Sequence, residues 1–116
     1  LIGSVKGKTV LMVDDMITTA GTVTEAARVV MNHGAEKVIV AATHPVFVGP
    51  ALQRLRESPI SKIVTTNTIP DGPRVEPIRD KLVELCISRL LAEAIHRIHH
   101  NMSISALFRK TAGAKR

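Results

Sequence analysis

The chain has 116 residues, of which 45% are hydrophobic and only 2% aromatic, and its formal net charge is +6. That length suits one domain with a modest core of Val, Ile, Leu, Ala and Met. No apolar run reaches the roughly 18 residues of a membrane span, and no signal peptide is visible. The single cysteine, Cys86, excludes an internal disulfide and fits a reducing compartment. We therefore expect a cytoplasmic protein without a membrane partner, in which Cys86 is a small buried hydrophobe.

Part of the positive charge lies in the tail Arg109–Arg116, and the rest is scattered along the chain. The chain has no Tyr or Trp and only two Phe, so it offers little surface for stacking bases. We therefore expect no nucleic-acid partner, a disordered basic tail over residues 109–116, and some attraction for anionic phosphates. Because the chain begins at Leu1 and not at Met, we also expect it to be a piece of a longer polypeptide.

Apolar runs alternate with amphipathic stretches, and periodicity predicts an element for each. In chain order we expect a buried strand over Thr9–Val13, a helix over Val23–Asn32, a strand over Lys37–His44, a helix from Pro50 to about Arg56, a strand over Ser61–Thr68, and a loop over Ile69–Pro77. The first of these helices would place Val23, Ala26, Ala27, Val29 and Val30 near one face, and Gly34 just beyond it would be its stop.

The last third of the chain has two interpretations. One long helix could run from Leu82 to Ile98, or a short strand over Leu82–Cys86 could precede a helix over Ser88–His100. Periodicity alone does not separate them. In either case the alternation of strands and helices predicts an α/β fold with a mostly parallel sheet flanked by helices.

The stretch TVLMVDDMITTAGT, Thr9–Thr22, carries the clearest functional signal. An apolar run ends on Asp14 and Asp15, and a loop of small residues follows and leads into a helix. Ligands of open α/β sheets bind at the carboxyl ends of the strands, and a helix N-terminus binds anions. Thr18, Thr19, Ala20, Gly21 and Thr22 therefore predict a phosphate-binding loop. It is not a P-loop, because the GKT at Gly7–Thr9 precedes the strand.

Two carboxylates beside a phosphate would repel it if they touched it. Acceptors suit the two hydroxyls of a vicinal diol, and a hydrated Mg²⁺ could share the site. Asp14 and Asp15 with this loop therefore predict a site for a ribose 5-phosphate group. The alternative is that the two aspartates only cap the loop.

VLMVDDMITTAGT resembles the motif that binds phosphoribosyl pyrophosphate. Four further segments, VIVAATHPVFVGPALQRL, IVTTNTIP, LLAEAIHRIH and SISALF, follow in the order and at the spacing of ribose-phosphate pyrophosphokinases. The resemblance covers about Gly3 to Phe108. It implies a three-layer phosphoribosyltransferase-like domain of type I over residues 1–108, as the C-terminal domain of a longer two-domain enzyme.

The family transfers the diphosphoryl group of ATP to ribose 5-phosphate with Mg²⁺, and the products are 5-phosphoribosyl 1-diphosphate and AMP. The resemblance implies that Asp14 and Asp15 hold the ribose hydroxyls, Asp14 more directly, and that residues 18–22 wrap the 5-phosphate. The mobile catalytic loop, the ATP pocket and most Mg²⁺ ligands would precede Leu1. We therefore expect no catalytic residue in this segment and no turnover by it alone. The resemblance also implies an N-terminal domain as a partner, and a homo-oligomer.

The chain departs from the family pattern at Thr18, where an Asp is usual, and at Val48, where a Ser is common. Ser103 and Ser105 resemble a regulatory segment that binds phosphate or ADP, although a plain loop is an equal interpretation. For His44 we expect a positional role. His96 and His100 have the i, i+4 spacing of metal ligands, but a solvated helix face is favoured because no third ligand is evident.

Two other functions remain open. A phosphoribosyltransferase would consume the same diphosphate, but its base-recognising hood is not readable in this sequence. A non-enzymatic subunit would keep the fold without the activity. Such subunits tend to lose the Thr and Gly of the loop, whereas this chain keeps Thr19, Gly21 and Thr22.

Overall fold

The structure is a computed structural model that describes residues 3–108. It divides into two compact units, one ending at Leu85 and the other starting at Cys86, and each is described by itself. Of the helices within residues 3–108, none combines the length and the apolar character that crossing a bilayer requires.

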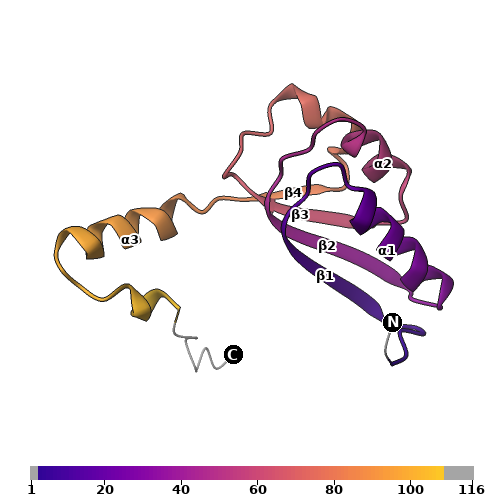
Figure 1. Ribbon diagram of the computed structural model, residues 1–116, viewed down its shortest axis with the longest axis horizontal. Helices are drawn as coiled ribbons and strands as arrows, with labels where there is room; N and C mark the ends of the chain where they lie inside the picture. Colours follow the sequence, from indigo (N-terminus) through magenta and orange to yellow (C-terminus); the bar gives the residue numbers. More distant parts are fainter. Residues whose placement is uncertain (1–2, 109–116) are drawn as a thin grey trace. The chain divides into compact units, whose positions relative to one another are not determined.

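The first unit contains a four-stranded, fully parallel sheet in the order β1-β2-β3-β4 (Figure 1). Its elements are β1 (Thr9–Met16), α1 (Gly21–Asn32), β2 (Lys37–His44), α2 (Ala51–Glu57), β3 (Lys62–Thr66), the 3₁₀ helix η1 (Pro73–Ile78) and β4 (Leu82–Leu85). The second unit holds α3 (Ser88–His99) and the 3₁₀ helix η2 (Ile104–Leu107). The predicted α/β class with a parallel sheet is confirmed, and so is the strand-then-helix interpretation of the last third.

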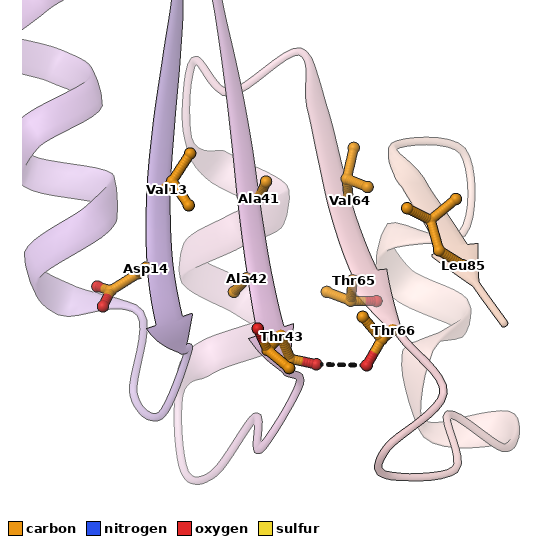
Figure 2. Close-up of a pocket in the computed structure, with 9 residues that line it drawn as sticks. All are labelled: Val13, Asp14, Ala41, Ala42, Thr43, Val64, Thr65, Thr66 and Leu85. Atoms are coloured by element: carbon orange, nitrogen blue, oxygen red, sulfur yellow. Dashed lines mark hydrogen bonds between the residues drawn. The ribbon is translucent and has the colours of Figure 1, made fainter. Parts of the chain in front are cut away.

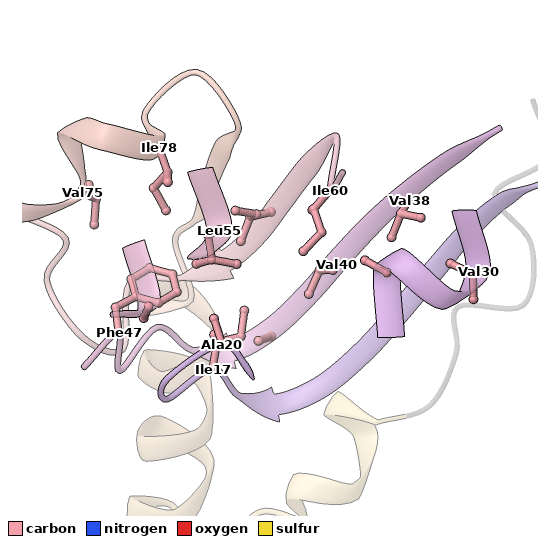
Figure 3. Packing of buried hydrophobic residues seen from close by; sticks show 14 of the residues in the cluster. Ile17, Ala20, Val30, Val38, Val40, Phe47, Leu55, Ile60, Val75 and Ile78 are labelled. Atoms are coloured by element: carbon pink, nitrogen blue, oxygen red, sulfur yellow. The ribbon is translucent and has the colours of Figure 1, made fainter. Parts of the chain in front are cut away.

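The core lies between one face of the sheet and the helices that cover it. Figure 3 shows Val38 and Val40 of β2 facing Val30 of α1 and Leu55 of α2, with side chains of η1 completing the cluster. These residues are at most 7% exposed. The alternation along β2 places Val38, Val40 and Ala42 in this core, whereas on β1 it leaves only Val10 and Met12 partly buried against it.

The opposite face of the sheet is open within the first unit. Leu11 and Val13 of β1 are 61% and 75% exposed, and Val83 and Leu85 of β4 are also exposed. The described residues 3–85 therefore form two layers, a sheet and one layer of helices.

Several predicted boundaries were wrong. β1 continues through Asp14 and Asp15 to Met16, because its main chain still pairs with β2, with Asp14 opposite Ala42 and Met16 opposite His44. β3 is shorter than predicted, and the loop after it contains η1. On α1 the buried residues are Thr24, Ala27 and Val30, whereas Val29 is 38% exposed.

Two more predictions concern single residues. Cys86 is exposed and not buried as predicted, because it stands just past the end of β4, outside the core. Gly34 follows α1 as predicted, with a left-handed φ of +87°, and its amide donates to the Met31 carbonyl. The predicted tail 109–116 lies outside the described residues.

Candidate functional site

The loop between β1 and α1 lies at the carboxyl edge of the sheet and is fixed by its main chain. The Ile17 amide donates to the His44 carbonyl at 3.0 Å, and the Ile17 and Thr18 carbonyls accept from the amides of Phe47 and Val48, each at 3.0 Å. The Ile17 side chain is buried in the core. The segment that follows β2 therefore holds the first half of the loop in place.

The second half of the loop depends on a strained residue. Ala20, the N-cap of α1, has a left-handed φ of 61°, which a residue with a Cβ adopts at a cost. Its carbonyl accepts from both the amide and the hydroxyl of Thr24, at 3.1 Å and 2.8 Å. Its methyl group is buried, so only the main chain of Ala20 can face a ligand.

The amides at the start of α1 are available to an anion. Within residues 3–108 no acceptor takes the amides of Thr19, Ala20 or Gly21. No side chain caps α1, and its first turn holds no acidic residue. Because the first amides of a helix lack partners within it and carry its positive end, this turn has the geometry and polarity of an oxyanion site.

Asp14 lies beside this turn. Asp14 follows Met12 on the helix-covered face, and Figure 2 shows its carboxylate directed away from the neighbouring strands, towards α1. Together with Thr22 it lines a depression of about 120 Å³, and Val23 and Ala26 form part of the apolar wall.

Asp15 is placed differently from Asp14. Neighbouring residues of a strand point to opposite faces, and Asp15 does not line this depression. Its amide donates to Oδ1 of Asp14 at 2.9 Å and so orients that carboxylate. Of the two predicted aspartates, the structure brings only Asp14 next to the loop.

A second depression of about 170 Å³ lies on the open face, at the ends of the strands (Figure 2). Val13, Ala41, Val64 and Leu85 give it mostly apolar walls. At its rim the Thr66 hydroxyl donates to the Thr43 carbonyl at 2.7 Å.

His44 is held at this edge by a neighbouring hydroxyl. Its Nδ1 lies 3.0 Å from Oγ1 of Thr68, whose hydroxyl in turn donates to the Thr43 carbonyl at 3.0 Å. This arrangement fixes the imidazole and ties β2 to the turn after β3, in keeping with a positional role.

Arg54 was not assigned to the site by the sequence. It projects from α2, and its Nη1 donates to the Thr19 carbonyl at 3.1 Å. A Cβ on Gly21 would lie 3.2 Å from the same nitrogen. Because the two residues joined by this hydrogen bond are 35 positions apart, no local pattern could have revealed the contact.

Arg74 also has a role that the sequence did not assign. Its guanidinium donates to the carbonyls of Asp71, Val46 and Pro45 at 3.2, 3.1 and 3.0 Å, and it lies 6.0 Å from the centre of the Phe47 ring. It therefore fastens η1 to the segment that supports the loop.

A carboxyl pair lies apart from this site. Asp71 is 7% exposed, and its oxygens receive no hydrogen bond from a donor group in the described chain. It shares a cavity of about 450 Å³ with Glu84 and Arg79. Desolvation, and then the negative charge of Asp71, raise the pKa of Glu84, and the positive charge of Arg79 partly opposes this rise. A neighbouring negative charge and desolvation both disfavour the ionised form of Glu84.

In the second unit, the predicted regulatory serines make local contacts. Oγ of Ser103 accepts from the Ser105 amide at 3.2 Å and caps η2. Nδ1 of His100 lies 2.8 Å from the His96 carbonyl.

Among residues 3–108, no group of three or more His, Cys, Asp and Glu side chains could hold a metal ion.

Comparison with known proteins identifies the family. Residues 1–109 match the family described as phosphoribosyl synthetase-associated domain. The chain belongs to this family. It is 53% identical over 109 residues to the ribose-phosphate pyrophosphokinase of Rhodopirellula baltica, and 50% identical over 108 residues to that of Caldanaerobacter subterraneus. The predicted resemblance to ribose-phosphate pyrophosphokinases is confirmed.

Comparison with a solved structure gives the same result as comparison of the sequences. The crystal structure of phosphoribosylpyrophosphate synthetase from Mycobacterium smegmatis superposes with a TM-score of 0.81 at 41% identity, over 86% of this chain and 33% of that one. The two curated relatives are matched over 93% of this chain and 34% of their own lengths. This chain thus spans about a third of the length of the proteins that it matches.

Proposed function

We propose that this chain is the ribose 5-phosphate-binding, C-terminal domain of a ribose-phosphate pyrophosphokinase. The whole enzyme would transfer the diphosphoryl group of ATP to the anomeric hydroxyl of ribose 5-phosphate, and it would release AMP. The observation that carries the proposal is the juxtaposition of open amides at Thr19–Gly21 with Asp14, which lines one depression with Thr22. The identity to proteins named for this activity supports it.

In this proposal the main chain of residues 18–22 binds the 5-phosphate. The amides of Thr19, Ala20 and Gly21 donate to phosphate oxygens, and the exposed hydroxyls of Thr18, Thr19 and Thr22 are further donors. The positive end of α1 favours the dianion. The Asp14 carboxylate accepts from the ribose hydroxyls, and Asp15 holds that carboxylate through its amide.

The chemistry of such a transfer depends on positioning and on neutralisation of charge. The described residues contribute the positioning of one substrate. ATP, the Mg²⁺ ligands and the catalytic residues would belong to the rest of the polypeptide, so we expect no turnover from this chain alone. An N-terminal domain, a homo-oligomer, a cytoplasmic location, and a regulatory phosphate or ADP site at Ser103 and Ser105 belong to the same proposal.

Isothermal titration of the 116-residue chain with ribose 5-phosphate tests the binding role. We expect Asp14→Asn to weaken ribose 5-phosphate about tenfold and inorganic phosphate little, because a charged acceptor for the diol is lost. Gly21→Val should weaken both ligands, because its side chain would occupy the approach to the amides. Equal affinity of all three proteins would show that the site is elsewhere.

A separate assay of AMP release from ATP and ribose 5-phosphate tests the expected inactivity. Turnover by the chain well above background would contradict the assignment of the catalytic residues to the rest of the enzyme.

A further inference from the structure

Arg54 stands in an electrostatically unusual place. Its side chain is exposed and reaches from α2 to the Thr19 carbonyl, next to the first residue of α1. A cation near the positive end of a helix is unfavourable on its own. Within residues 3–108 no carboxylate forms an ion pair with Arg54, and the first turn of α1 contains no acid. An oxyanion on the loop would relieve this concentration of positive charge.

The geometry shows how Arg54 acts on the loop. Its hydrogen bond takes the Thr19 carbonyl towards α2. The amide of Ala20 belongs to the same peptide plane as that carbonyl and points in the opposite direction. Holding the carbonyl therefore orients an amide that the proposed phosphate site uses.

Gly21 makes room for this contact. A Cβ at that position would lie 3.2 Å from Nη1 of Arg54 and 3.8 Å from Oγ1 of Thr19. The first distance is tighter than an ordinary van der Waals contact, so a side chain at residue 21 would require the guanidinium to shift by a few tenths of an ångström. Gly21 therefore leaves the space in which the Arg54 guanidinium lies.

We propose that Arg54 is a positioning residue of the oxyanion site, which orients the Thr19–Ala20 peptide and makes the site selective for dianionic phosphate. This inference rests on the proposed function, because it requires the loop to bind a phosphate. The guanidinium carries fixed charge at every relevant pH, so its attraction for the ligand grows when the phosphate loses its second proton.

The test is titration of the full chain with inorganic phosphate and with ribose 5-phosphate between about pH 5.5 and 7.5. This range includes the second ionisation of a phosphate monoester, which has a pKa of about 6. We expect Arg54→Gln to weaken binding about tenfold at the upper pH and less at the lower pH. Arg54→Lys should restore much of this pH dependence because it restores the charge. Arg56→Gln is the matched control, since Arg56 is an exposed residue of the same helix.

The outcomes are distinguishable. If the unaltered chain binds neither ligand, the proposed function fails and the role of Arg54 fails with it. If the unaltered chain binds and Arg54→Gln behaves like Arg56→Gln, only the inference about Arg54 is overturned. An equal loss of affinity at both pH values would indicate a purely structural role for Arg54 and would refute selectivity for the dianion. Should Arg54→Gln lower the thermal midpoint so far that it does not fold, Arg54→Met replaces it, because Met keeps an aliphatic stem without the charge, and binding equal to that of Arg56→Gln would overturn the inference.

Discussion

Replacement of Thr24 by Val should loosen the phosphate loop without disturbing the core. Thr24 is 6% exposed, and its hydroxyl donates to the Ala20 carbonyl at 2.8 Å. Val has the same shape, and the Ala20 carbonyl keeps its bond from the Thr24 amide at 3.1 Å. No buried acceptor is therefore orphaned, and the loss should be close to that of one net hydrogen bond, about 1 kcal/mol.

For a unit of this size, a loss of 1 kcal/mol corresponds to a fall of about 4–8 °C in the thermal midpoint. Because the lost bond restrains Ala20 in its left-handed conformation, affinity for inorganic phosphate should also fall, by up to about fivefold. Calorimetry of the 116-residue chain measures the first quantity and titration the second. Thr22→Val is the control for stability, since Thr22 is exposed in the same helix. An unchanged midpoint together with unchanged affinity would refute the claim that this bond holds the loop.

Three further predictions concern parts of the fold that support the site. Arg74→Met should lower the free energy of unfolding by about 2 kcal/mol in urea titrations, because three carbonyls lose a charged donor. Gly34→Ala should cost about 1–2 kcal/mol by the same measurement, since φ is +87° and the new Cβ would meet the Lys6 side chain at 3.3 Å; a neutral result would contradict that geometry. Glu84→Gln should flatten the pH dependence of stability. The folded state raises the pKa of Glu84 above 4.5, chiefly through desolvation and Asp71, so the unaltered chain should lose stability as pH rises from that value while the variant loses less. Parallel curves for the two proteins would count against a raised pKa of Glu84.

The apolar pattern of the sequence predicts the elements well where side-chain burial determines them. β2 occupies Lys37–His44 as predicted, because the apolar run there coincides with the length that pairs with β1. The end of β1 was misplaced for the complementary reason. At the carboxyl edge the side chains of Asp14 and Asp15 reach solvent, so charge costs little there, while the main chain continues its ladder with β2.

Other features cannot be read from the apolar pattern of the sequence. Thr24 reads as a polar residue in a helix, yet it is buried because its hydroxyl is satisfied by carbonyls three and four residues earlier. Ala20 adopts a conformation for which the sequence would suggest Gly or Asn. Arg54 joins the loop across 35 residues. Each of these becomes visible only once α1 and α2 are packed on the sheet.

Three side chains that contact the loop share one property, which affects how the loop tolerates substitution. The buried Ile17, the Thr24 hydroxyl and the Arg54 guanidinium all restrain the main chain of the loop. The side chains of Thr18 and Thr19 remain exposed. If the amides provide most of the proposed binding, the residue at position 18 can change from the Asp usual in the family to Thr while the amides keep their directions. Substitutions at Thr24 or Arg54, which leave every proposed ligand group in the chain, should therefore impair phosphate binding more than substitution of Thr18 by Ala.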